Sequence, residues 1–223
     1  ILMSLKLISI WLGQKHLSLI QKEYLVMPDN QFKWTDITGD VFRAYMSQIP
    51  DVEEINKKLV DFIHTFDKYE DSNTNPHSFQ TPWGIRSKET DHIKKHVFSM
   101  LKHSGYSEQF ICYELFGNVY KTGDSNVMHI HHGADFTFNY YVKCPENSSP
   151  TVFSTSKKNV PAKEGRLVIF PGHIKHHVPK SPHQGERITL TGNLKAIDPR
   201  AVQRDAKMFF VTNNLNGVSY NAR

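Results

Sequence analysis

The chain has 223 residues, of which 39% are hydrophobic and 12% aromatic, so it is long enough to bury one substantial core. The net charge of +5, with histidine neutral, comes from scattered lysines and arginines, so it indicates a general preference for anions and nothing sharper. Cys112 and Cys144 are the only cysteines, which excludes a disulfide scaffold and a thiolate metal site and favours a reducing, cytoplasmic compartment.

Residues 1–50 mix short apolar stretches with polar breaks, and we treat them as an N-terminal extension before a single domain of residues 51–223. The apolar opening ILMSLKLISIWL is too short to span a bilayer and is interrupted by Lys6. It also lacks the basic start and the small-residue cleavage site of a secretory signal. We therefore expect no membrane partner.

Two helices are predicted between residues 51 and 105. The first is indicated by apolar residues at helical spacing, namely Ile55, Leu59, Phe62, Ile63 and Phe66. Asp51 and Glu54 have the spacing of a capping box at its start. The second follows from apolar positions 93, 97 and 101, with Gly105 as its stop. The stretch between them, residues 70–84, has the composition of an irregular loop.

Short β-prone runs replace the helical pattern from residue 110 onward. They are separated by Gly, Pro, Asn and Lys turns, and they read FICYELF, FTFNYYV, TVFST, RLVIF and RITLTGN. Several strands at such spacing after helices predict an α+β chain whose C-terminal half is a β-sandwich or barrel.

Histidines gather in two of the segments that join these strands. Six of the thirteen lie in HIHH at 129–132 and HIKHH at 173–177. Residues two apart on an extended segment point to the same side, so His129 and His131 can converge on one metal ion while Ile130 packs away. Neutral imidazole suits iron, zinc or copper. The alternative is that these histidines are solvent-facing or hydrogen-bonded loop residues.

Polar residues alternate along the last predicted strand and share one face of it: Arg187, Thr189, Thr191 and Asn193. Because an unpaired buried guanidinium is costly, either this face is exposed or an anion meets it. Arginine with threonine suits a carboxylate. A second polar face, on the side of the paired histidines, carries Asp135, Thr137, Asn139 and Tyr141.

The ordered combination NVYKTGDSNVMHIHHGADFTFNYYV, FPGHIKHHV and GERITLTGN resembles the Fe(II)- and 2-oxoglutarate-dependent dioxygenases. It is most similar to their prolyl-hydroxylase-like branch, which is common in marine bacteria and their phages. The resemblance implies a double-stranded β-helix core, a cupin-like jelly roll, over about residues 106–195, with supporting helices before it and a C-terminal segment of residues 196–223. It also implies a hydroxylase that uses Fe(II), 2-oxoglutarate and O₂, acting in a bacterial or virus-infected cytoplasm.

Carried over by position, the resemblance makes His129 the first iron ligand and His176 the distal one. Arg187, helped by Thr189, holds the C5 carboxylate of 2-oxoglutarate. Most of the superfamily has Asp or Glu at the second ligand position, where this chain has His131. We expect His131 to be a third imidazole ligand. Two alternatives remain open, namely Asp135 as the second ligand and a halogenase-like site with chloride.

Alternation along the strands and the resemblance together predict four further contacts to 2-oxoglutarate. They are Tyr113, Asn139, Tyr141 and Asn193. A packed or hydrogen-bonded strand residue is the alternative at each. His173, His177 and His183 lie close in sequence and either shape substrate entry or are exposed loop residues. The substrate is a small molecule or a peptide, the basic balance favours an anionic one, and nucleic acid stays open as a partner.

Two other classes of protein compete with the oxygenase. A cupin-like metalloenzyme also uses three histidines on a β-barrel, but the Arg187 and Thr189 strand argues against it. A metal-binding or structural jelly-roll protein without catalysis stays open, because His131 replaces the usual carboxylate.

Overall fold

A computed structural model describes residues 44–67, 78–106 and 109–197 of the chain. The predicted N-terminal extension before residue 44 and the C-terminal segment after residue 197 lie outside the described residues. Within the described part, no helix is both long enough and apolar enough to cross a membrane. The division of the chain at residue 50 stays a prediction, although the first strand of the larger sheet already lies before it.

Both predicted helices are present. Helix α2 (Glu53–Ile63) buries Leu59 and Ile63, and helix α3 (Lys88–His103) buries the predicted apolar face, with Gly105 just beyond its end. The capping box predicted for α2 is wrong, because its N-cap is Val52 and makes no side-chain hydrogen bond. A capping box is found instead on α3, between Ser87 and Thr90.

The larger sheet has six antiparallel strands in the order β1-β8-β5-β10-β3-β2. Their bounds, in that order, are Tyr45–Gln48, Arg166–Pro171, Phe136–Lys143, Arg187–Ile197, Gln109–Tyr120 and Phe79–Gln80. The four central strands coincide with predicted β-prone runs. The two edge strands were not predicted, because two to four residues carry too little periodicity.

The smaller sheet has four antiparallel strands in the order β4-β9-β6-β7. Their bounds, in that order, are Asn126–His129, His176–Val178, Thr151–Phe153 and Asn159–Val160. Both predicted histidine segments therefore lie on this sheet or at its end, and the predicted arginine strand, β10, lies on the larger one.

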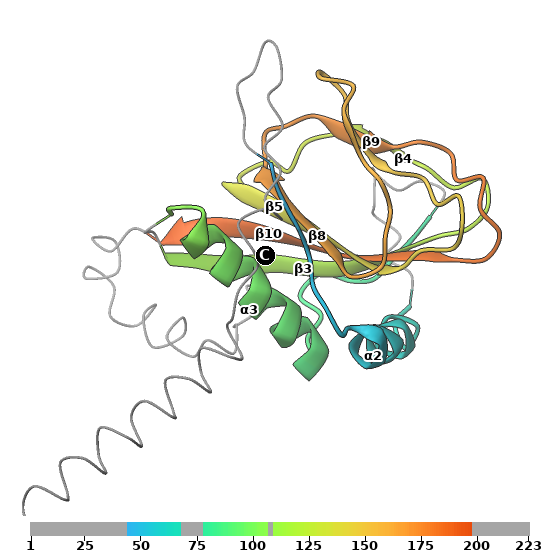
Figure 1. Cartoon of the computed structure of the whole chain (residues 1–223), viewed down its shortest axis with the longest axis horizontal. Helices are drawn as coiled ribbons and strands as arrows, with labels where there is room; N and C mark the ends of the chain where they lie inside the picture. Colours follow the sequence, from blue (N-terminus) through green and yellow to red (C-terminus); the bar gives the residue numbers. More distant parts are fainter. Residues whose placement is uncertain (1–43, 68–77, 107–108, 198–223) are drawn as a thin grey trace, which may run out of the picture. The chain divides into compact units, whose positions relative to one another are not determined.

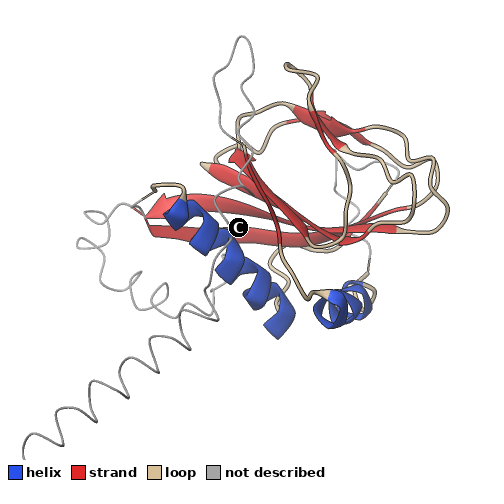
Figure 2. Cartoon of the chain, in the orientation of Figure 1, coloured by secondary structure: helices blue, strands red, loops and turns tan. Residues whose placement is uncertain are grey.

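The helices cover one face of the larger sheet, and the smaller sheet lies across the other (Figure 1, Figure 2). A core cluster joins the helices to the sheet through residues such as Leu59, Ile93 and Leu190. A second cluster includes Tyr141, Phe153 and Phe170, from strands of both sheets. Two antiparallel sheets packed face to face, with helices against the larger, confirm the predicted jelly-roll fold.

Candidate metal and cosubstrate site

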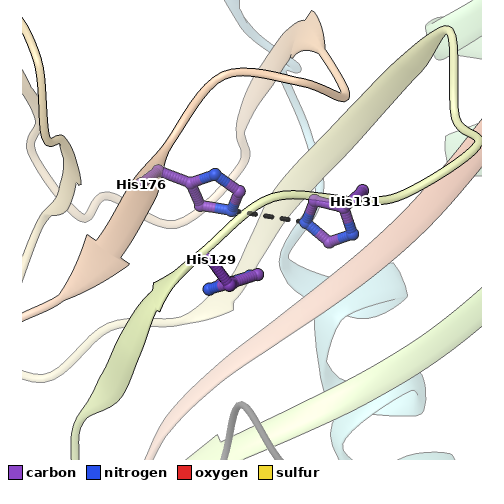
Figure 3. Close-up of side chains that lie close together, drawn as sticks. All are labelled: His129, His131 and His176. Atoms are coloured by element: carbon purple, nitrogen blue, oxygen red, sulfur yellow. Dashed lines mark hydrogen bonds between the residues drawn. The ribbon is translucent and has the colours of Figure 1, made fainter.

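Three histidines converge at one end of the smaller sheet (Figure 3). One ring nitrogen from each of His129, His131 and His176 lies within 4.8 Å of the others. The closest pair is Nε2 of His131 and Nε2 of His176, 3.3 Å apart. A metal ion lies roughly 2.1 Å from each imidazole nitrogen, so the most distant nitrogens must move closer together before all three rings can share one ion.

Backbone carbonyls orient two of these rings. His129 Nδ1 is 2.8 Å from the carbonyl oxygen of Val127, and His176 Nδ1 is 2.9 Å from that of Ile174. A carbonyl only accepts, so Nδ1 carries the proton in both rings and Nε2 keeps its lone pair. In both histidines Nδ1 donates to the backbone carbonyl of the residue two positions earlier, which leaves Nε2 available as a metal ligand.

A β-bulge in β4 brings His129 into the cavity together with Asn126. Asn126 pairs with Val178 and His129 with His176, so β4 has one residue more than β9 between the two pairs. In a regular strand, residues three apart point to opposite faces, but the extra residue lets both line the same cavity. The exposed Val127 and Met128 form the outer side of this bulge.

Burial keeps the three imidazoles neutral. It lowers the pKa of His131 to about 3, with a further lowering from His129. Burial followed by the two neighbouring histidines holds the pKa of His176 well below its usual value. Burial also lowers the pKa of His129, against the raising effect of the Val127 carbonyl. Neutral imidazole is the form that binds a metal ion.

Arg187 lies across the cavity, at the start of β10, and its side chain is almost fully buried, at 1% exposure. Its guanidinium carbon lies 4.8 Å from the ring centre of Tyr120 and 5.1 Å from that of Tyr141. Among the described residues no carboxylate pairs with this guanidinium, and its polar neighbour is Tyr120, whose pKa it lowers through its charge and a side-chain hydrogen bond. A buried guanidinium without a neighbouring carboxylate costs several kcal/mol, which makes Arg187 a candidate receptor for an anion.

A cavity lies between the three histidines and Arg187. Its wall on the larger sheet is mostly polar and includes Asn118, Tyr120, Asn139, Thr189 and Thr191. Strand register explains this, because Thr189 pairs with Asn118, and Thr191 with Asn139. The cavity lining therefore takes part of each predicted polar face, namely Arg187, Thr189 and Thr191 from one and Thr137 and Asn139 from the other.

No protein-family model and no curated protein sequence matches the chain. Its structure is similar to that of a viral collagen prolyl hydroxylase from Paramecium bursaria Chlorella virus-1 in complex with 2-oxoglutarate. The TM-score is 0.58 and the identity 17%, over 69% of this chain and 96% of that one. A Pseudomonas putida prolyl-4-hydroxylase gives a TM-score of 0.53 and 13% identity, over 68% and 92% of the two chains.

An oxidoreductase of the 2OG-Fe(II) oxygenase family from Burkholderia pseudomallei is also similar, with a TM-score of 0.51 and 10% identity over 68% of this chain and 84% of that one. The chain has the fold of these oxygenases. Because the identities are low, the likeness establishes the fold and does not establish the reaction.

Within this oxygenase fold, Asp135 does not join the histidines. Its Oδ1 lies 3.1 Å from Lys195 Nζ, and its Oδ2 accepts a 2.7 Å hydrogen bond from the backbone N–H of Ala196. Both oxygens are therefore engaged at the end of β10. The Asp135 carboxylate is therefore directed away from the three histidines in this structure.

The four further cosubstrate contacts predicted by parity have different positions in the oxygenase fold. Asn139 lines the cavity and accepts a hydrogen bond from Thr191, and Tyr141 lies beside Arg187. Asn193 does not line the cavity and donates to Glu114 instead. Tyr113 is half-exposed and also lies outside the cavity lining.

Strand β3 has a bulge at Tyr113. Leu194 pairs with Cys112 and Asn193 with Glu114, so Tyr113 is an extra residue on β3 opposite β10. The alternation of β3 is therefore out of phase on the two sides of this point. The cavity-lining residues of β3, Phe116, Asn118 and Tyr120, all lie on one side of this bulge.

Sequence reasoning missed Tyr120 and Asn126. Tyr120 is buried, pairs with Arg187 across the sheet, and its hydroxyl accepts a 3.3 Å hydrogen bond from Asn126 Nδ2. The pKa of Tyr120 is raised by burial, against the lowering effect of Arg187. His183, one of the loop histidines, is buried and donates to the Tyr120 carbonyl at 3.1 Å, whereas His173 is exposed.

Proposed function

We propose that the chain is a non-haem iron(II) oxygenase that uses 2-oxoglutarate and O₂ to hydroxylate an organic substrate, releasing succinate and CO₂. One observation carries the proposal: three neutral imidazoles and one buried guanidinium, with no carboxylate among the described lining residues, share the same cavity. Imidazole alone suits several metals. The anion receptor across the cavity favours iron, because 2-oxoglutarate brings a carboxylate for the arginine and a keto acid for the metal.

The residues fit the two groups that the fold implies. His129, His131 and His176 would hold the iron, and Arg187 with Thr189 would bind the far carboxylate of 2-oxoglutarate. Bound together, iron and 2-oxoglutarate supply the activation of O₂, with electrons from oxidative decarboxylation. Tyr120 and Tyr141 flank the guanidinium and fix its plane, so that its paired donors are ready for a bidentate carboxylate.

The substrate class is a peptide or a small organic molecule, since the similar structures include a collagen prolyl hydroxylase and a prolyl-4-hydroxylase. We place the reaction in the cytoplasm, because both cysteines are free and the fold relies on packing alone. The alternative is a jelly-roll protein without catalysis. The buried Arg187 guanidinium argues against it, because such a protein would need no receptor for an anion.

The cosubstrate assignment is tested by Arg187→Ala. We expect this variant to bind 2-oxoglutarate at least ten-fold more weakly than the parent, because one charge-assisted bidentate contact is worth on the order of 1.5–3 kcal/mol. Isothermal titration calorimetry of the Co(II)-loaded protein measures the affinity. Arg166→Ala is the control, because Arg166 is on β8, outside the cavity lining, and donates to the Pro161 carbonyl.

Turnover is measured in the same proteins by the formation of succinate in air with Fe(II). The parent and Arg166→Ala should form succinate, and Arg187→Ala should form far less at equal 2-oxoglutarate. Equal binding of 2-oxoglutarate by parent and Arg187→Ala would contradict the cosubstrate assignment, whatever the turnover shows.

A further inference from the structure

The charges around the cavity do not balance once the proposed ligands are bound. Among the described residues that line it, Arg187 is the only formally charged side chain, and no aspartate or glutamate is present. The three histidines add no charge, because imidazole binds a metal ion in its neutral form. The protein therefore offers the cavity a single positive charge and no negative one.

Two nearby carboxylates are turned to other partners. Asp135 is held by Lys195 and by the backbone of Ala196. Glu114 accepts a hydrogen bond from Asn193, whose side chain does not line the cavity. Neither acidic group is among the lining residues, so neither offsets the charge of the metal.

A divalent metal and Arg187 together bring three positive charges, and 2-oxoglutarate brings two negative ones. One positive charge is left over, in a cavity walled by buried side chains where an unbalanced charge is costly. A carboxylate at position 131 would remove this excess. Because His131 stands there, the balancing charge has to come from another molecule.

We propose that the substrate carries a negatively charged group, a carboxylate or another monoanion, that lies in this cavity beside 2-oxoglutarate. The inference rests on the proposed function and narrows its substrate class. The negative group is attracted by the positive charges of the metal and of Arg187, both when it lies beside the metal and when it coordinates it. The net charge of +5 on the whole chain favours the approach of the same class of molecule.

The test compares two small probes of nearly the same shape and different charge, acetate and acetamide. The protein is loaded with one equivalent of Co(II), saturated with 2-oxoglutarate, and titrated with each probe while the visible Co(II) spectrum is recorded. We expect acetate to perturb the spectrum with a dissociation constant at least ten-fold lower than that of acetamide.

A matched pair of variants isolates the charge at position 131. His131→Asp and His131→Asn both place an oxygen ligand there, but only the aspartate brings a negative charge. The preference for acetate over acetamide should persist in His131→Asn and fall at least several-fold in His131→Asp. An equal preference in the two variants overturns the proposal.

The design separates this inference from the proposed function on which it rests. If 2-oxoglutarate fails to change the Co(II) spectrum of the parent, the proposed function itself fails. If 2-oxoglutarate binds and acetate binds no more tightly than acetamide, only the anionic substrate fails. The comparison of probes in the parent decides the matter even if neither variant retains Co(II).

Discussion

Gly172 sets the path of the chain at the second metal-ligand position. Its carbonyl accepts a 2.8 Å hydrogen bond from the backbone N–H of His131, and its own N–H donates to the Asp135 carbonyl at 3.2 Å. A β-carbon at residue 172 would lie 2.5 Å from the Ala134 carbonyl oxygen and 3.0 Å from that of His131. Only glycine lets the two segments approach so closely.

Gly172→Ala should therefore displace the segment that carries His131. We expect metal affinity to fall ten- to a hundred-fold, the range seen when support around a ligand is disturbed. Calorimetric titration with Co(II) measures this. Gly123→Ala is the matched control, because Gly123 has a φ of +86° and nothing within 4 Å of an added β-carbon. The control should lose stability through backbone strain and keep its metal affinity, and equal loss of affinity in both variants would contradict this role for Gly172.

Single residues also show which parts of the cavity lining could be predicted from the sequence and which could not. Alternation correctly placed Thr189 and Asn139 in the cavity lining, because no bulge separates them from the strand centre. Tyr113 lies outside the cavity lining, and alternation gave no reason to select Asn126, which a bulge in β4 brings to the cavity. Bulges depend on how two strands pair, which a single strand's sequence does not contain.

At the scale of elements, helices and long strands were predicted and short edge strands were not. The central strands β3, β5, β8 and β10 have six or more residues each and carry a readable pattern. The strands that hold the histidines, β4 and β9, have four and three residues. Their histidines were found through motif order and parity, and their strand pairing was visible only in the structure.

Helix α3 carries a pair of histidines outside the cavity. Nε2 of His92 lies 3.1 Å from Nε2 of His96, and burial lowers the pKa of His96 to about 4, with a further lowering from His92. Burial, followed by Lys95, also lowers the pKa of His92. The helix therefore holds these imidazoles in their neutral form at neutral pH.

This arrangement predicts a pH-dependent stability. The unfolded chain takes up a proton at residue 96 as the pH falls through 6.5, whereas the folded chain does so only near 4. Stability is therefore complete above pH 6.5 and is lost progressively toward pH 4. His96→Gln should reduce the loss of unfolding free energy between pH 7 and pH 5 by on the order of 1 kcal/mol, after allowance for solvent screening. Urea unfolding at the two pH values measures it, and an unchanged difference would rule this contribution out.

At the scale of the whole molecule, the fold brings the proposed metal ligands and the proposed anion receptor together from two sheets. The histidines lie on or beside β4 and β9 of the smaller sheet, and Arg187 begins β10 of the larger one. The order of these motifs along the chain was enough to predict the jelly roll, which the structure and its similarity to solved oxygenases confirm. The net charge of the cavity could not be predicted from the sequence, because it depends on which carboxylates have partners outside the cavity in the folded chain.

The measurement that tests the account most directly is the visible spectrum of the protein with Fe(II) and 2-oxoglutarate in the absence of O₂. Chelation of iron by the keto acid produces a weak charge-transfer band, and we predict this band in the parent. His176→Ala should lack it, and Arg187→Ala should need at least ten-fold more 2-oxoglutarate to develop it. No band in the parent, together with no succinate formed when air is admitted, would contradict the assignment of this chain as a 2-oxoglutarate-dependent oxygenase.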